Sequence, residues 1–243
     1  MKIVIIGYGK MGKAINSEAQ KLSILVSKII NNHDELMSYE FQDQEIAIDF
    51  TEPLEFIKNI KILTLKQVNT VCGTTGWFKY IGQVQELVLK SNIGFIYSSN
   101  FSIGVNIFWK IIKSASTIIN QFEEYDVIGH EKHHKNKKDS PSGTLLTTAQ
   151  IVINNIKRKN KIVTDSVNKP INPKLLHLRS SRCGTTIGVH KIIFDSIDDY
   201  IKISHHAKNR HGYAHGAIKC AQWIKNKKGF YSIDSFINEM INV

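Results

Sequence analysis

The stretch EKHHKNKKDSPSGT, residues 131–144, gathers the residue types that most often carry chemistry. Two adjacent histidines and four lysines are followed by Pro-Ser-Gly-Thr. Histidine titrates near neutral pH and can transfer protons, whereas lysine stays a cation unless it is buried. Four interpretations are open: a metal site, a nucleic-acid contact, a solvated basic loop, or a site of proton transfer beside a bound anion.

Metal and nucleic-acid binding are the weaker interpretations. His133 and His134 are neighbours, so in a strand or loop their side chains point in different directions, and the surrounding lysines repel a cation. A basic run can contact phosphates, but no aromatic residues alternate with this one to stack on bases. We therefore expect neither a metal ion nor a nucleic acid here, while composition alone leaves the solvated loop open.

The catalytic interpretation explains more of the stretch. Pro141–Thr144 is typical of a loop that closes on a helix N-terminus, with Ser142 or Thr144 near the cap. Such a terminus binds anions through its unpaired N–H groups. Lys137 and a histidine add charge and donors beside it. Together these groups would bind a carboxylate and deliver a proton after a hydride has been transferred.

A second motif lies at the N-terminus, where KIVIIG predicts a buried strand and a helix follows. The letters between them form Gly-x-Gly-x-x-Gly, which lets the backbone approach a pyrophosphate at the helix N-terminus. A strand-to-helix turn without a ligand is the alternative. The prediction is a Rossmann-type dinucleotide site made by Gly7, Tyr8, Gly9, Lys10, Met11 and Gly12.

The end of the second strand bears on the choice of cofactor. Dinucleotide folds usually place an acidic residue there for the ribose hydroxyls. This chain has Asn31 instead, with Asp34 and Glu35 nearby. Asn31 can bond a hydroxyl and does not repel a 2′-phosphate. We therefore expect NADPH use, or poor discrimination between NADPH and NADH.

Two further segments follow predicted strands, and the carboxyl ends of parallel strands are where open α/β sheets bind ligands. The first is a glycine turn after the strand at residues 69–73, and the second, weaker one ends the strand at 93–99. Either segment can instead be a plain loop turn. The residues predicted to contact the cofactor are Gly73, Thr74, Thr75, Ser98, Ser99, Asn100 and Phe101.

The elements that position these residues divide into two groups. Residues 1–101 alternate strands and helices, including a second strand at 23–30 expected to be buried, which predicts an α/β domain with a parallel sheet. Residues 102–209 contain a long helix, a strand leading to Glu131, a second helix and a hairpin at 187–207, which predicts an α+β domain with a mixed sheet. Helices within 210–243 are expected to pack back on the first domain.

Composition limits the class of protein. The 243 residues are 42% hydrophobic, and no apolar run is long enough to span a membrane. Three distant cysteines argue against disulfides and structural zinc, and the N-terminus is not typical of a signal peptide, so we expect a cytoplasmic protein. The net charge of +11 favours anionic partners without choosing among them.

The ordered motifs resemble those of 4-hydroxy-tetrahydrodipicolinate reductase (dihydrodipicolinate reductase), an enzyme family of lysine and diaminopimelate biosynthesis. The similarity covers nearly the whole chain. It includes the N-terminal glycine motif, the spacing from Glu131 through His133, Lys137 and Asp139 to Pro-Ser-Gly-Thr, and the segments 49–51, 73–76, 100–105 and 208–210. The chain departs from the family at Asn31, where an acidic residue is frequent.

The resemblance implies a role for each matching position. His133 takes the acid/base position and Lys137 that of the proton-donating lysine, without settling which of them protonates the product. His134 matches a substrate-binding histidine, Gly143 and Thr144 a carboxylate-binding pair, and Arg210 a family arginine near the domain junction. The implied enzyme is an NAD(P)H-dependent oxidoreductase that reduces a cyclic dicarboxylate and forms a homotetramer through its second domain.

Two other functions stay open from the sequence. The first is another two-domain NAD(P)-dependent enzyme, such as a semialdehyde dehydrogenase, which would need a reactive cysteine. Cys72 follows a buried strand and is better explained as a small core residue. The second is a nucleotide-sensing, DNA-binding regulator, for which the net charge is the only support.

Overall fold

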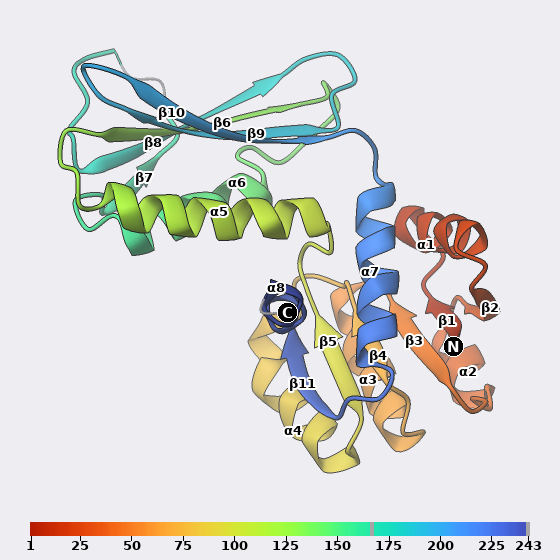
Figure 1. The fold of residues 1–243 in the computed structure, drawn as a ribbon. Helices are drawn as coiled ribbons and strands as arrows, with labels where there is room; N and C mark the ends of the chain where they lie inside the picture. The colour runs from red at the N-terminus through yellow and green to blue at the C-terminus, as the bar shows by residue number, and fades with distance from the viewer. Residues whose placement is uncertain (166–167, 242–243) are drawn as a thin grey trace. The chain divides into compact units, whose positions relative to one another are not determined.

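The computed structural model describes residues 1–165 and 168–241, and the chain divides into two compact units. Unit 1 comprises residues 1–103 and 211–243, and unit 2 comprises residues 104–210 (Figure 1). No helix in the described ranges is both long and apolar enough to cross a membrane.

Unit 1 is built on a six-stranded parallel sheet with the order β11-β5-β4-β3-β1-β2. From β1 the chain adds β2 on one side, whereas β3, β4 and β5 follow on the other side. Such folds bind ligands where the strand order switches in this way, here between β1 and β3. The strands are β1 (Lys2–Ile6), β2 (Leu25–Ile30), β3 (Glu45–Asp49), β4 (Thr70–Cys72), β5 (Gly94–Tyr97) and β11 (Gly229–Ser232).

Two features of this sheet differ from expectation. The second strand was expected to be buried, but β2 lies at the edge of the sheet and Leu25 is 58% exposed. An apolar run does not reveal whether a strand has one neighbour or two, because both positions favour β-branched residues. The sixth strand, β11, was not expected, since GFYS is too short to stand out between two helices.

Helices cover both faces of the sheet. They are α1 (Lys10–Lys21), α2 (His33–Ser38), α3 (Pro53–Leu65), α4 (Ile81–Ser91), α7 (His211–Ile224) and α8 (Ile233–Ile241), with a 3-10 turn η1 (Phe78–Tyr80).

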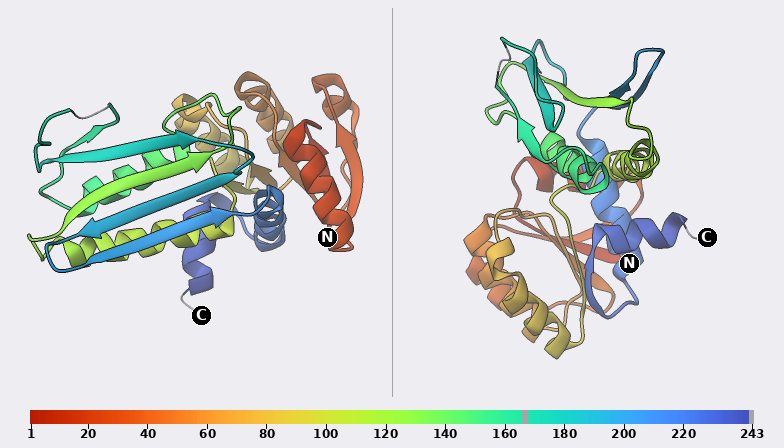
Figure 2. Two further views of the ribbon diagram at one scale, coloured as in Figure 1. Left: turned by 90° about the horizontal axis from the view of Figure 1, so that it is seen from above. Right: turned by 90° about the vertical axis from the view of Figure 1, so that its left-hand side faces the viewer.

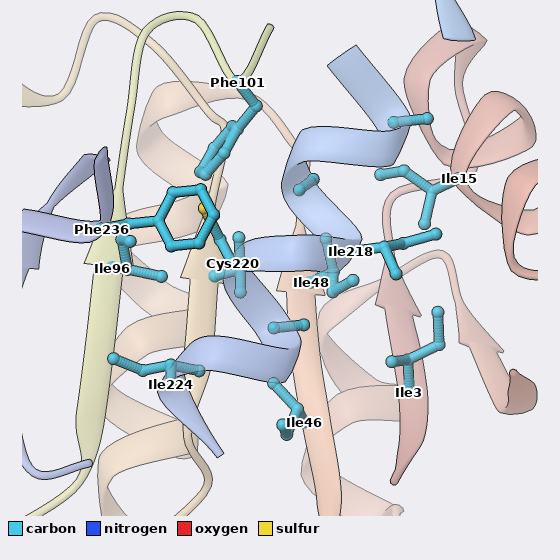
Figure 3. Close-up of a cluster of buried hydrophobic side chains, with 14 of the residues drawn as sticks. Ile3, Ile15, Ile46, Ile48, Ile96, Phe101, Ile218, Cys220, Ile224 and Phe236 are labelled. Atoms are coloured by element: carbon cyan, nitrogen blue, oxygen red, sulfur yellow. The ribbon is translucent and has the colours of Figure 1, made fainter. Parts of the chain in front are cut away.

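Successive strand residues point to opposite faces, so β1 contributes to both cores of unit 1. Ile3 and Ile5 pack with α1, α7 and α8, whereas Val4 and Ile6 pack with α3 and α4. Ile218 of α7 lies among the isoleucines of β1 and β3 in the first of these cores (Figure 3). The C-terminal segment therefore completes the core of unit 1, although the residues that directly precede it in the sequence, 104–210, belong to unit 2.

Unit 2 is built on a five-stranded mixed sheet with the order β10-β9-β6-β8-β7. β9 is antiparallel to β6 and β10, while β8 is parallel to β6 and β7. Helices α5 (Ile103–Ile119) and α6 (Gly143–Asn155) lie across one face of this sheet (Figure 2). The strands are β6 (Asp126–His133), β7 (Lys161–Val163), β8 (Leu175–Arg182), β9 (Gly188–Asp195) and β10 (Tyr200–Ala207).

The fold class predicted from the sequence is confirmed: an α/β unit with a parallel sheet and a second unit with a mixed sheet. The expected hairpin is β9–β10. Strands β7 and β8 were not expected, because KIV is very short and LLHLRSSR mixes apolar with polar residues on both faces.

Candidate active site and cofactor site

Strand β6 places the acidic residue and the first histidine of the EKHH sequence on one buried face. Glu131 is 3% exposed and His133 is 6% exposed, whereas Lys132 between them is exposed. The alternation follows from the two-residue period of a strand. His133 was expected in a strand or loop. It is the last residue of β6, so the hydrogen-bonded strand fixes the position of its backbone.

The two carboxylate oxygens of Glu131 have different partners. Oε1 accepts from the backbone N–H of Ser142 at 3.0 Å and from the hydroxyl of Ser180 at 2.8 Å, and both terminal nitrogens of Arg182 lie 3.4 Å away. Burial acts to raise the pKa of Glu131, but the bonds from Ser142 and Ser180 together with His133 hold this pKa below its ordinary value. Glu131 is therefore a buried anion that links β6 to β8 and to the start of α6.

The second oxygen faces two imidazole rings. Oε2 of Glu131 lies 3.6 Å from Nδ1 of His133 and 3.6 Å from Nε2 of His190 on β9. The two rings pack edge to face with their centroids 5.1 Å apart. Nε2 of His190 also lies 3.2 Å from the hydroxyl of Ser142.

Burial decides the charge of both histidines. It lowers the pKa of His190 to about 4, with His133 as a further cause. Burial also lowers the pKa of His133, against the attraction of Glu131 and with help from Lys137 and Arg182. Both imidazoles are therefore neutral near pH 7, and a neutral imidazole can accept a proton and return it.

Helix α6 begins beside this cluster. Ser142 is its N-cap, and its hydroxyl accepts from the backbone N–H of Leu145 at 3.2 Å. Gly143 and Thr144 form the first turn, and a methyl group added at Gly143 would meet nothing within 4 Å. The structure therefore brings the predicted helix N-terminus into contact with Glu131 and His190 of this cluster, and its first turn is open on the side of Gly143.

The lysines of the stretch are not equivalent. Lys132, Lys135 and Lys138 are exposed. Lys137 is partly covered, and its ammonium group pairs with both oxygens of Asp139 at 2.8 and 2.9 Å. This pairing lowers the pKa of Asp139 and holds the Lys137 cation close enough to His133 to lower the pKa of that histidine.

The cluster also has the donor types of a metal site, which the sequence argument had tested only for His133 and His134. One ligand atom each from Glu131, His133 and His190 lie within 4.8 Å of one another. Two cations oppose this use: Arg182 shares the same carboxylate, and Lys137 lowers the pKa of both histidines. Acid–base chemistry fits these surroundings better than cation binding.

Sequence reasoning missed three members of the cluster. Glu131 was part of the motif but had no role, and the alternation of a strand would have placed it beside His133. His190 lies far along the chain, and only the pairing of β6 with β9 sets it opposite Glu131. Arg182 comes from β8, a strand that was not expected. His134 is half-buried at the end of β6, and Arg210 is exposed after β10, with no hydrogen bond or ion pair to the cluster within residues 1–165 and 168–241.

In unit 1 the predicted cofactor residues follow β1, β2, β4 and β5, at one edge of the sheet. Gly7 has a φ of +88°, and an added Cβ would lie 2.7 Å from the carbonyl oxygen of Phe50. A Cβ at Gly12 would lie 2.2 Å from the carbonyl oxygen of Gly7, so the turn requires glycine at both positions. Gly9 is the N-cap of α1 and has open space beside it, while Tyr8, Lys10 and Met11 are half-buried or exposed around it.

A buried carboxylate, that of Asp49, forms hydrogen bonds that hold the loop after β4 in place. Asp49 accepts from the hydroxyls of Thr51 and Thr74 at 2.6 and 3.0 Å and from the side-chain amide of Asn59 at 2.9 Å. Burial raises the pKa of Asp49 despite these bonds. The hydroxyl of Thr74 is thus used inside the protein, and Thr75 is the exposed hydroxyl of this loop.

The loop after β5 mixes buried and exposed residues. The hydroxyl of Ser98 donates to the carbonyl of Asn100 and accepts from its N–H, which makes a tight local turn. Phe101 is 2% exposed and packs in the core of unit 1, while Ser99 is exposed. Ser99 is therefore the side chain of this loop that solvent reaches most readily.

The sequence places the uncharged Asn31 at the end of β2, but the carboxylate of Glu35 lies beside it. The backbone N–H of Asn31 donates to Oε2 of Glu35 at 2.9 Å, and the side chain of Asn32 caps the backbone N–H of Glu35. These reciprocal bonds form a variant of the capping box at the start of α2. Glu35 thereby supplies at this tip the charge that Asn31 lacks.

Comparison with known proteins identifies the family. Family models for the N-terminus and the C-terminus of dihydrodipicolinate reductase match residues 1–101 and 104–237. The chain belongs to the dihydrodipicolinate reductase family. The resemblance of its motifs is thereby confirmed.

Individual relatives support the membership. The 4-hydroxy-tetrahydrodipicolinate reductase of Christiangramia forsetii is 32% identical over 99% of both chains. That of Archaeoglobus fulgidus is 33% identical over 95% of this chain and 82% of its own. The dipicolinate-bound dihydrodipicolinate reductase from Paenisporosarcina sp. superposes with a TM-score of 0.77 over 97% of this chain and 99% of its own at 20% identity, which shows the common fold.

The thiol needed by the alternative dehydrogenase is not reactive in this member of the dihydrodipicolinate reductase family. Cys72 is fully buried, and burial together with Asp49 raises its pKa well above the ordinary value. A thiolate nucleophile is therefore not available at this position.

Proposed function

We propose that this chain reduces 4-hydroxy-tetrahydrodipicolinate to tetrahydrodipicolinate in lysine and diaminopimelate biosynthesis. Family membership supports the reaction. The observation that carries it in this chain is the buried group of Glu131, His133 and His190, which contacts the N-terminus of α6 through Ser142. Reduction of a cyclic dicarboxylate requires a site that binds a carboxylate and a proton donor close to it.

Each group has one task in this proposal. When bound, a nicotinamide would supply a hydride. The ring hydroxyl leaves as water together with a proton from the neighbouring ring carbon, and the hydride and one proton add to the conjugated imine that results, so that the net change is hydroxyl replaced by hydrogen. Gly143, Thr144 and the first turn of α6 bind a carboxylate through N–H groups, and His134 and Arg210 add substrate contacts. His133 or Lys137 delivers the proton to the ring as negative charge develops on the conjugated imine.

In this proposal residues 7–12 of unit 1 would hold the pyrophosphate of the cofactor, and residues 73–75 and 98–101 would hold its nicotinamide. The sequence favoured NADPH or poor discrimination, because Asn31 carries no charge. The carboxylate of Glu35 at the same tip changes this balance, since it can accept bonds from ribose hydroxyls and repels a 2′-phosphate. We propose that NADH is used at least as well as NADPH.

A homotetramer formed through unit 2 is the proposed assembly, in the cytoplasm. The sheet of unit 2 has α5 and α6 on one face, and among the described residues no helix covers the other (Figure 2). That other face carries Ile128, Val189 and Ile193, each only half-buried. Light scattering on the purified protein tests the assembly, and a monomer at micromolar concentration would contradict it.

A coupled assay tests the reaction itself. Dihydrodipicolinate synthase, pyruvate and aspartate semialdehyde generate the substrate in place, and the loss of NADH or NADPH absorbance reports its reduction. We expect oxidation that depends on all three components. No oxidation above background with either cofactor would overturn the proposed function.

A further inference from the structure

The buried carboxylate beside His133 has an unequal set of partners. Oε1 of Glu131 is engaged by Ser142, Ser180 and Arg182, whereas Oε2 has no hydrogen-bond partner within the described residues. Nδ1 of His133 likewise has none and faces Oε2 at 3.6 Å. Both atoms are buried, and an unpaired buried polar atom costs free energy, so its presence in a native structure calls for an explanation such as a catalytic role.

Electrostatics decides which nitrogen of His133 carries the proton. A neutral imidazole has one N–H and one lone pair. A lone pair on Nδ1 would face the anionic Oε2 and be repelled, whereas an N–H there is attracted. The gap of 3.6 Å is longer than a hydrogen bond, but catalytic hydrogen bonds are commonly long before substrate binds.

The other nitrogen of His133 lies next to a glycine. The neighbour of Nε2 is Gly188 at the start of β9, where an added Cβ would lie only 3.1 Å from that nitrogen. The φ of Gly188 is not in the left-handed region, so the backbone does not require glycine here. Glycine at this position instead keeps the edge of the ring uncrowded.

We propose that Glu131 is a positioning residue for His133: its Oε2 selects the tautomer with Nδ1 protonated, and Gly188 keeps Nε2 open as the atom that exchanges a proton with the substrate. The proposal rests on the proposed function and adds to it the residue that orients the acid/base group. It also means that the imidazolium formed when Nε2 takes up a proton is stabilised by the same carboxylate.

Several other charged or titratable groups face this ring. Lys137 and Asp139 come from the segment after β6, Arg182 from β8, and His190 from β9. The cations disfavour the imidazolium and the carboxylates favour it. Glu131 differs from the others because it combines full burial with direct contact to Nδ1.

The decisive measurement needs no substrate. Imidazole ¹⁵N chemical shifts, assigned with His133→Asn, distinguish the two neutral tautomers in the wild-type protein. We expect the proton of His133 on Nδ1. A proton on Nε2 in the folded wild type would overturn the proposal without any Glu131 variant having to fold. Wild-type protein without turnover would overturn the proposed function and leave the tautomer assignment standing.

Glu131→Gln tests the cause. The amide oxygen of glutamine can replace Oε1 toward Ser142 and Ser180, and its NH₂ group then faces Nδ1 as a donor. We expect the ¹⁵N pattern of His133 to reverse, kcat to fall by roughly 10²–10⁴-fold, and the acid limb of the pH profile of kcat to move, with NADH affinity unchanged. An unaltered tautomer together with kcat within about threefold of wild type would overturn the proposal.

Gly188→Ala is an independent variant and Ser181→Ala its control. The alanine methyl crowds Nε2, so we expect a loss of kcat with the Nδ1 proton retained. The hydroxyl of Ser181 donates to the backbone carbonyl of Glu131 and not to its carboxylate, so its removal should leave the tautomer and the pH profile as in wild type. Full activity of Gly188→Ala would contradict the role of Nε2.

Discussion

The two candidate sites are built in different ways. The dinucleotide loop of unit 1 is mostly backbone: its shape depends on Gly7 and Gly12, which approach other backbone atoms too closely for a side chain. The acid–base cluster of unit 2 is made of side chains from β6, β8 and β9, assembled by strand pairing. A loop of the first kind is encoded in a few consecutive letters, whereas a cluster of the second kind exists only in the folded sheet.

The largest expected effect comes from Lys137, whose charge acts on His133. Lys137→Ala removes a cation near His133 that is also one of the two proposed proton donors, and we expect kcat to fall by roughly 10²–10⁴-fold. Lys138→Ala removes the same charge from an exposed neighbour and should change kcat little. Steady-state kinetics in the coupled assay measures both, and equal losses would show that the stretch acts only as a general basic patch.

The next largest effect is expected in the pH dependence of stability, through His190. The pKa of His190 is about 4 in the folded chain against an ordinary 6.5, so the unfolded chain binds more protons between these values. The contribution of His190 to the free energy of unfolding is therefore fully present above pH 6.5. It is lost as the pH falls toward 4, by up to about 3 kcal/mol.

Urea unfolding at several pH values measures this slope. His190→Gln should flatten it, whereas His206→Gln, at an exposed position on β10, should leave it unchanged. A wild-type slope that survives in His190→Gln would mean that other groups cause it.

The backbone site should respond to a single methyl group. In Gly12→Ala the methyl meets the Gly7 carbonyl, and we expect a loss of about 1–3 kcal/mol in unfolding free energy together with weaker NADH binding. Gly82→Ala in α4 meets nothing and should stabilise the chain by about 0.5–1 kcal/mol. Urea unfolding and NADH fluorescence titration separate the two, and tight NADH binding by Gly12→Ala would contradict the close approach.

The smallest expected effect concerns cofactor choice. Glu35→Gln removes the charge at the tip of β2 while keeping an acceptor for the Asn31 N–H, and we expect kcat/KM for NADPH to rise about tenfold relative to NADH. Asp34→Asn, at an exposed neighbour, serves as the control. If the ratio stays constant, Glu35 is only a capping residue.

Much of the fold followed from pattern. Alternating strands and helices predicted the parallel sheet of unit 1, and two-residue alternation predicted the β9–β10 hairpin, because each pattern reflects a local period of the backbone. The exposed side of β2 and the presence of β7, β8 and β11 were not predictable in this way, since they depend on which strands become neighbours.

The sequence by itself determined the glycine turn, a helix N-terminus with Ser142 or Thr144 near its cap, and the spacing of His133 and Lys137, because sterics and helix capping act over a few residues. Only the tertiary structure decided that Glu131, His190 and Arg182 meet around His133. The physical reason is the same in each case. The charge and protonation of a side chain depend on burial and on neighbours brought close by folding, and the order of letters does not record them.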